Sequence, residues 1–373
     1  MRIGILTLPL HTNYGGILQA YALQTVLERM GHEVELLDLA SWIHRSWWRK
    51  YIYIVKRLGK YATSKSVCLG FQKEQEKRER AKRKFVDIFI QRYINSRKLQ
   101  GYDEISPTDY DAIVVGSDQI WRQKYMPMNS VEAPFLVFTH GWNIKRIAYA
   151  ASFGSDEWEY TEKNTNVAKQ AIIRFDAVST REKSGISLCG NYLDCKNAVQ
   201  VLDPTLLLDR NDYEYIIEDS KLTHNVHGKL MCYVLDYTKE KKQYISECAK
   251  KLGMSPFETN SKYEIKDASL DEIVQPPVEQ WLRSFRDSSF VITDSFHACV
   301  FSILFHKPFV VIGNKGRGLA RFESLLSLFR LEDRMVTDFF DVSLCDKPID
   351  WDNVDIKLQE LRADSKAFLE KAL

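Results

Sequence analysis

His297 has the surroundings in this sequence that most favour catalysis. It follows Val291–Ser295, an apolar run that ends in Thr, Asp and Ser, and it precedes the apolar stretch Ala298–Phe305. This pattern predicts a buried strand, a helix N-cap and a helix. His297 would then lie in the first helical turn at the carboxyl edge of a parallel sheet, where open α/β proteins bind ligands. An imidazole there can move a proton beside an anion held by the helix N-terminus.

Polar and charged residues near His297 extend this candidate site. Asp294 could hold the imidazole ring, and Ser295 lies between the two. After the next predicted strand come three cations that could bind the anionic groups of a substrate, Lys315, Arg317 and Arg321. The alternative is that His297 only caps or packs the helix, but the gathering of these residue types favours a functional role.

Three further turns follow predicted strands and are candidates for ligand contact. Asn13-Tyr14-Gly15-Gly16 could approach a phosphate closely, although it is neither a P-loop nor a dinucleotide fingerprint. Gly116-Ser117-Asp118 offers small and polar groups, with a simple turn as the alternative. Arg181 could hold a carboxylate or phosphate, unless it forms a surface salt bridge with Glu182.

The elements that would position these residues alternate between strand and helix. We expect an α/β protein with two Rossmann-like, doubly wound domains, arranged as in the GT-B fold, with the active site in the cleft between them. The predicted N-terminal domain spans 1–205 and carries a basic helical insertion at about 42–99. The predicted C-terminal domain spans 206–373, and its final helix at 357–373 would pack back on either domain. A linker near 203–225 would join the two halves.

Composition narrows the class of protein. The 373 residues are 45% hydrophobic and 27% charged, which is enough for two packed cores. No apolar run reaches the roughly 18 residues of a spanning helix, so we expect a cytoplasmic protein. The seven cysteines are scattered without a C-x-x-C pair, which is typical of reduced core residues, and no metal site is expected.

Charge is distributed unevenly along the chain. Residues 42–98 hold 17 Lys/Arg and 4 Asp/Glu, a net charge of +13, which leaves −11 on the rest. This basic stretch also contains Trp and Tyr, so it is a candidate for contact with the inner membrane face or with an anionic acceptor. A solvated helical arm explains the composition equally well. Nucleic acid is not an expected partner, because no recognised binding module accompanies the basic residues.

Several segments together resemble the polysaccharide pyruvyl transferase family. They occur in the family's order across the chain outside 42–99, and the ordered set is more specific than any single motif. The matching segments are Asn13–Gly16 with Leu18–Tyr21, Val115–Trp121, Tyr149–Gly154, Ser179–Gly185, Asp203–Leu207, and Thr293–His297 with Lys307–Phe309.

The resemblance implies an activity and roles for particular residues. It implies a GT-B-like fold, phosphoenolpyruvate as the donor and co-substrate, a sugar that receives pyruvate as a ketal, and no cofactor or metal. His297 matches the family's catalytic histidine, Arg181 an arginine that holds the donor, and Arg317 a downstream cation. Some branches have an arginine where this chain has Ser295, so one donor contact is either missing here or supplied elsewhere, by Lys315 or Arg321.

Two rival functions remain open at the level of sequence. A glycosyltransferase that uses a nucleotide sugar would share the fold, and the glycine turn at Asn13–Gly16 would suit a diphosphate. A protein without enzymatic activity could instead act at a membrane surface through the basic, aromatic stretch.

Overall fold

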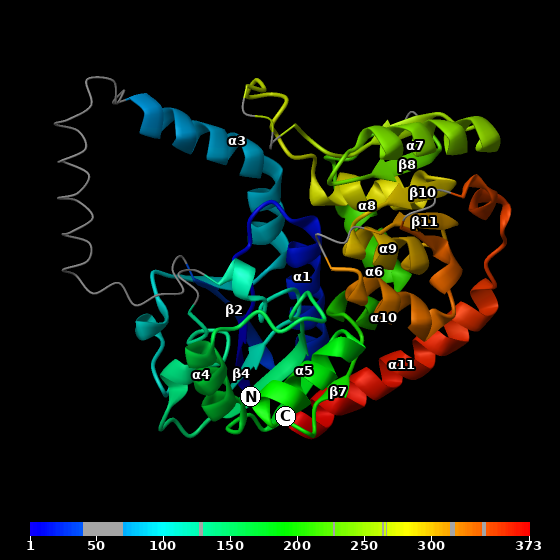
Figure 1. The fold of residues 1–373 in the computed structure, drawn as a ribbon. Coiled ribbons are helices and arrows are strands. Elements are labelled where there is room, and N and C mark those ends of the chain that lie inside the picture. The colour runs from blue at the N-terminus through cyan, green and yellow to red at the C-terminus, as the bar shows by residue number, and fades with distance from the viewer. Residues whose placement is uncertain are drawn as a thin grey trace.

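The computed structural model describes residues 1–39, 70–126, 130–226, 228–262, 265, 267–313, 318–337 and 341–373. It consists of two parallel sheets with helices packed against them (Figure 1). Each sheet lies in its own half of the molecule, and the pocket described below lies between the halves. The predicted arrangement of two Rossmann-like domains in a GT-B-like α/β fold is therefore confirmed.

The first sheet has seven strands in the order β3-β2-β1-β4-β5-β6-β7, and all neighbouring pairs are parallel. Its inner strands are short apolar runs that are buried on both faces, as expected for a sheet covered by helices on both sides. The strands are β1 (Arg2–Leu6), β2 (Glu33–Leu39), β3 (Ser96–Leu99), β4 (Ala112–Val115), β5 (Lys145–Ala151), β6 (Ala177–Thr180) and β7 (Val199–Gln200).

The second sheet has five parallel strands in the order β12-β11-β10-β8-β9. Its central strands β8, β10 and β11 are fully buried. The strands are β8 (Leu230–Tyr233), β9 (Pro256–Glu258), β10 (Phe290–Thr293), β11 (Phe309–Ile312) and β12 (Met335–Val336).

The α-helices cover these sheets and join the two halves. Within the described residues they are α1 (Tyr14–Arg29), α3 (Gly70–Tyr93), α4 (Glu162–Ile172), α5 (Lys183–Leu193), α6 (Arg210–Asp219), α7 (Lys239–Leu252), α8 (Val278–Asp287), α9 (Phe296–Leu304), α10 (Ala320–Phe329) and α11 (Trp351–Ala372). Alternate residues of the first sheet face either the α1 side or the α4–α5 side, and one continuous core reaches from α1 to α8 and α9. The two halves therefore share a core.

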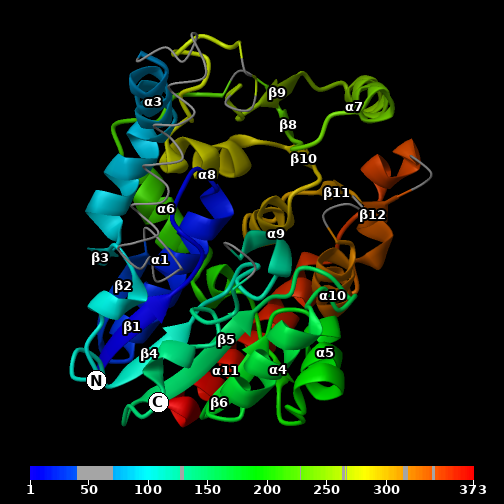
Figure 2. The same ribbon diagram turned by 60° about the vertical axis from the view of Figure 1, so that its left-hand side comes forward.

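Helix α11 begins in the second half and ends beside the first sheet (Figures 1 and 2). Arg362 donates to the carbonyl of Leu206 at 2.8 Å, and Lys145 on β5 donates to the carbonyl of Ala372 at 3.0 Å. The N- and C-termini consequently lie close together. The domain boundary near residue 205 stays a prediction.

Two elements differ from the sequence prediction. The predicted helical insertion extended to residue 99, but Ser96–Leu99 form an edge strand beside β2. Its residues are largely polar because an edge strand is open to solvent, and the apolar pattern of a buried strand is absent. Helix α6 lies within the predicted linker at 203–225, where Asp209 and Asp212 form a capping box. The predicted part of the insertion at 42–69 lies outside the described residues.

Candidate active site

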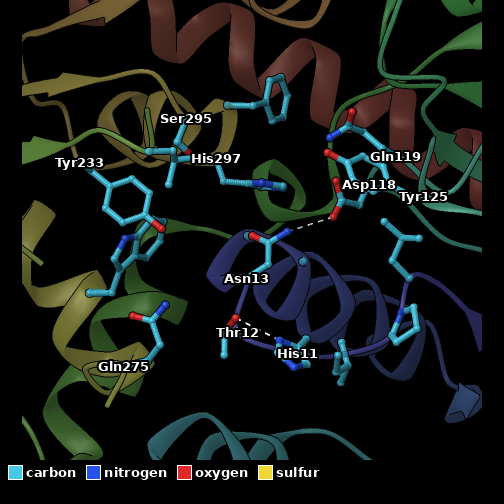
Figure 3. A pocket seen from close by; sticks show the side chains of 18 of the residues that line it. His11, Thr12, Asn13, Asp118, Gln119, Tyr125, Tyr233, Gln275, Ser295 and His297 are labelled. Carbon is cyan, nitrogen blue, oxygen red and sulfur yellow. Dashed lines mark hydrogen bonds between the residues drawn. The ribbon is translucent and has the colours of Figure 1, made fainter. Parts of the chain in front are cut away.

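A pocket of about 300 Å³ lies between the carboxyl edges of the two sheets. The first half lines it with the loop after β1, the first turn of α1 and the loop after β4, and the second half lines it with the ends of β8 and β10 and the start of α9. Parallel sheets place ligands at their carboxyl edges, and here two such edges face one pocket. Figure 3 shows the pocket with Asn13 and Asp118 on one side and Tyr233 and Ser295 on the other.

The first turn of α1 presents backbone to the pocket. Asn13 is the N-cap residue, yet its side chain makes no capping hydrogen bond. Its amide nitrogen instead donates to a carboxylate oxygen of Asp118 at 3.3 Å (Figure 3). Gly15 and Gly16 also line the pocket. The start of α1 therefore brings the partial positive charge of a helix N-terminus to the pocket, and the side chain at its N-cap makes no capping hydrogen bond.

The first turn of α9 has the same feature on the opposite wall. Ser295 is its N-cap residue and makes no side-chain capping bond. Ser295, Phe296 and His297 all line the pocket. Two helix N-termini therefore meet at one cavity, and both carry a partial positive charge.

The imidazole of His297 lies directly against Gly15. A Cβ atom placed on Gly15 would be 2.0 Å from Nδ1 of His297, which no real contact allows. Glycine is therefore required at position 15 because the ring occupies the space of its side chain. The glycine turn predicted from the sequence thus gives room to the histidine as well as to a ligand.

A buried carboxylate, Asp203, lies on the Nε2 side of the same ring. Its Oδ2 is 3.5 Å from Nε2 of His297, an ion-pair distance that exceeds a usual hydrogen bond. Oδ2 also accepts from Arg181 at 2.7 Å and from Ser117 at 3.1 Å. Burial alone would raise the pKa of Asp203, but His297, Arg181 and Thr205 hold this pKa well below its ordinary value.

Arg321 on α10 brings a second arginine close to the pocket, and it lines the cavity directly. Its guanidinium lies 5.8 Å from the ring centre of Phe296, while that of Arg181 lies 4.2 Å from the same ring. Burial and the nearby charge of Arg181 lower the pKa of Arg321 to about 10. Arg321 still carries a charge at neutral pH and is suited to an anionic ligand.

The structure corrects the role predicted for Asp294. Its carboxylate accepts from Lys241 at 2.6 Å and from the backbone N–H of Leu235, also at 2.6 Å. The carboxylate within ion-pair distance of His297 is instead Asp203. Asp294 points toward β8 and α7 and so ties β10 to its neighbours, because its oxygens are already engaged there.

Four predicted site residues do not line the pocket, although Asp294 does. Arg181 is 4% exposed and ion-paired with Asp203, and its role in holding the donor stays a prediction. Ser117 bonds the same carboxylate, and Gly116 packs near β1. Tyr14 is buried and donates to the carbonyl of Pro276 at 2.7 Å, which joins the two halves.

The predicted residues that do line the pocket are Asn13, Gly15, Gly16, Asp118, Asp294, Ser295, His297 and Arg321. Lys315 and Arg317 lie outside the described residues. Among the residues described, no group of three or more His, Cys, Asp or Glu side chains is placed to hold a metal ion. Nor does any helix in this part of the chain have the length and apolar character to cross a bilayer.

The family model for polysaccharide pyruvyl transferase matches residues 13–316, which is most of the chain and includes both walls of the pocket. The chain belongs to this family. Membership makes it a transferase, and it agrees with the order of motifs found in the sequence. A search of curated proteins found no match.

Solved structures similar to this chain include two UDP-GlcNAc 2-epimerases. The enzyme from Neisseria meningitidis bound to UDP-GlcNAc has 10% identity and a TM-score of 0.43, over 98% of this chain and 100% of that chain. The enzyme from Methanocaldococcus jannaschii has 11% identity and a TM-score of 0.46, over 95% of each chain.

Several residues that build the pocket were missed by the sequence reasoning. Gln119 and Tyr125 follow the Gly116–Asp118 turn, and Tyr233 ends β8, so the strand-end rule used for other residues could have found them. Gln275 lies in a loop between β9 and α8, where no local pattern marks it. Asp203 was noted only within a motif, because its approach to His297 depends on the packing of the two halves.

Proposed function

We propose that this enzyme transfers pyruvate from phosphoenolpyruvate to a sugar of a polysaccharide or its precursor and forms a cyclic ketal. Membership of the family supports the reaction class. The observation that carries the proposal is the position of His297, in the wall of a pocket into which two uncapped helix N-termini open. That arrangement offers one proton donor beside places for two anionic groups.

The donor would bind through backbone N–H groups and Arg321. Phosphoenolpyruvate carries a carboxylate and a phosphate, and each suits a helix N-terminus. The first turns of α1 and α9 supply two such ends, and Arg321 supplies a full positive charge. This chain has Ser295 where some family branches carry an arginine. The helix N-termini would therefore contribute more to binding of the anionic donor than they do in those branches.

His297 would act as the general acid. Its proton passes to the methylene carbon of phosphoenolpyruvate while a sugar hydroxyl attacks the enol carbon, so that one C–O bond forms and the methylene becomes a methyl group. The C–O bond to phosphate then breaks, and phosphate leaves with its electron pair. A second hydroxyl of the same sugar attacks the same carbon and closes the ketal. Of the two protons that the hydroxyls release, one restores the proton that His297 gave up, and the other is taken up by the phosphate.

The acceptor would lie among the neutral polar and aromatic side chains of the pocket. Gln119 and Tyr125 line one end, and Gln275 and Tyr233 line the other (Figure 3). Amide groups can bond sugar hydroxyls as donors and acceptors, and aromatic rings can pack against the apolar face of a sugar. A sugar with two neighbouring hydroxyls fits this lining better than a highly charged acceptor would.

Helix α3 supports a further, separate proposal about location. Three exposed cations, Lys77, Arg80 and Lys84, follow one another at helical spacing and form an outward stripe. This stripe would approach anionic lipid at the cytoplasmic membrane face, where a lipid-linked acceptor would be found. Pelleting with anionic and with neutral vesicles tests it. Binding that is independent of lipid charge, or that survives replacement of all three cations by Gln, would contradict it.

Thermal unfolding with phosphoenolpyruvate tests the proposed donor. A ligand at about 100 times its dissociation constant stabilises the folded state by about 2.7 kcal/mol, which shifts the unfolding midpoint upward. We expect this shift with phosphoenolpyruvate and a smaller one with pyruvate, because pyruvate lacks the phosphate. Uridine diphosphate serves as the control for a nucleotide-sugar enzyme.

The pattern of shifts decides between the candidates. A shift with uridine diphosphate and none with phosphoenolpyruvate would replace the proposal with a glycosyltransferase. A shift with phosphoenolpyruvate that is lost in Arg321→Gln would support both the donor and its site, and release of phosphate in the presence of oligosaccharides would then identify the acceptor.

A further inference from the structure

We propose that Asp203 is the positioning residue for the general acid, and that it forms with His297 a carboxylate–imidazole dyad divided between the two halves of the molecule. The inference rests on the proposed function in that it takes His297 as the acid. It assigns to Asp203 the task of fixing which ring nitrogen carries a proton and where the ring points.

Asp203 is itself held from several directions. It caps the short 3₁₀ helix Pro204–Leu207, with Oδ1 accepting from the backbone N–H of Thr205 at 3.0 Å and from its hydroxyl at 2.6 Å. Oδ2 accepts from Arg181 and Ser117 and faces Nε2 of His297. A carboxylate fixed by this many bonds can orient a neighbouring ring, since it does not need to reorganise.

The two ring nitrogens of His297 have different neighbours. Nε2 of His297 is fully buried and has no hydrogen-bond partner among the described residues, and the nearest carboxylate is that of Asp203. On the other side Nδ1 lies against the backbone of Gly15. A buried nitrogen without a partner is costly, so Nε2 should carry a proton and direct it to Asp203. A carboxylate at that position also stabilises the imidazolium form needed for proton donation.

The dyad joins residues that belong to different sheets. Asp203 follows β7 of the first sheet, and His297 follows β10 of the second. Their 3.5 Å separation is longer than a hydrogen bond, so a small approach of the two halves around the substrates would complete it. The acid would then be fully oriented only when the pocket is closed, which limits loss of its proton to water.

Other charged groups surround this pair. Arg181 bonds Asp203 and lies 3.9 Å from both Asp118 and Glu182, and Arg321 approaches the same ring of Phe296. A neighbouring carboxylate, Asp294, is engaged with Lys241 instead. Among the carboxylates of the described residues, Asp203 lies within ion-pair distance of both His297 and Arg181, which distinguishes it as the orienting group.

The test reads the tautomer of His297 directly, by ¹⁵N spectra of the histidine-labelled protein at alkaline pH, where a neutral ring reports which nitrogen is protonated. The signal is assigned from its loss in His297→Gln. We expect a protonated Nε2 in the wild-type protein. In Asp203→Leu with Arg181→Met the preference for protonated Nε2 should be lost, and replacing both partners avoids leaving a buried, unpaired charge.

The matched control replaces the other buried ion pair beside α9. Asp294→Leu with Lys241→Met also removes a buried ion pair, in which Asp294 accepts two backbone N–H bonds, and it should leave the tautomer of His297 unchanged. If the Asp203 variant does not fold, Asp203→Asn gives the same readout, because an amide oxygen attracts the Nε2 proton less than a carboxylate does.

The outcomes separate this inference from the proposed function. If the tautomer of His297 stays the same without the Asp203 carboxylate, Asp203 does not orient the ring. The same conclusion would follow if the tautomer changed equally in the control. Turnover should fall by tenfold or more in the Asp203 variant while the thermal shift with phosphoenolpyruvate persists. A wild-type protein with no response to phosphoenolpyruvate would count against the proposed donor alone, and the tautomer would still decide the role of Asp203.

Discussion

The turn between β1 and α1 and the turn between β10 and α9 face the same pocket from the two halves. Each follows a buried strand, begins a helix with an uncapped N-terminus and lines the pocket. The first turn supplies Gly15 and Gly16, whereas the second supplies Ser295 and His297. One half therefore contributes backbone N–H groups and space, and the other contributes the reactive side chain.

The comparison shows that neither turn forms the candidate active site alone. Gly15 lacks a side chain because the ring of His297 fills that volume. His297 in turn finds its carboxylate, Asp203, in the first half. The two Rossmann-like halves thus resemble each other in their backbone fold. The catalytic role of His297 depends on its contacts with Gly15 and Asp203 of the first half.

The largest effect should follow from His297→Gln. Loss of the proton donor should lower turnover by about 10²–10⁴ while the fold and the thermal shift with phosphoenolpyruvate are kept, because the helix N-termini remain. Phosphate release measures turnover. Turnover within a few-fold of the wild type would remove His297 from the mechanism and with it the contrast between the two turns.

Gly15→Ala should have the next largest effect. The added Cβ would overlap the imidazole, so the ring must move, and a displacement of about 1 Å can cost about 10² in rate. Gly190→Ala is the control, since it also lies within a helix but has nothing within 4 Å of its added Cβ. Equal turnover in the two variants would show that the volume beside Gly15 is not needed by His297.

Arg321→Gln should weaken donor binding by about tenfold or more, since a hydrogen bond to a charged group contributes about 1.5–3 kcal/mol. The dependence of the unfolding midpoint on phosphoenolpyruvate concentration measures it. Arg80→Gln, on the exposed face of α3, should leave this dependence unchanged. Undiminished donor binding in Arg321→Gln would indicate that the helix N-termini hold both anionic groups.

The smallest predicted effect concerns stability in acid. The pKa of Asp203 is well below its ordinary value in the folded protein, so its unfolded carboxyl takes up a proton first as pH falls. The stability contributed by Asp203 is therefore present above about pH 4 and declines as pH falls further. Urea unfolding at several acidic pH values should show a flatter pH dependence in Asp203→Leu with Arg181→Met. If the double variant showed an equally steep pH dependence, the lowered pKa of Asp203 in the folded protein would not be a source of the acid sensitivity.

Sequence reasoning recovered the local architecture well where the pattern was apolar and periodic. The strand, turn and helix around His297 agree closely with β10, α9 and β11, because burial on both faces and an N-cap signal are local properties. Strand β3 and helix α6 were missed. The first is polar because it lies at a sheet edge, and the second begins at a capping box inside a segment predicted to be a linker.

The sequence by itself determined the strand-end turns, the two-sheet α/β fold and the candidate histidine. Only the tertiary structure decided which side chains of those turns face the pocket. Arg181 turns inward because it neutralises buried Asp203, and Asp294 pairs with Lys241 and not with His297. Asp203 and His297 are 94 positions apart in the numbering, and packing of one half against the other brings them to 3.5 Å. Spacing along a chain reports local geometry, whereas a contact between domains depends on the shared core that joins them.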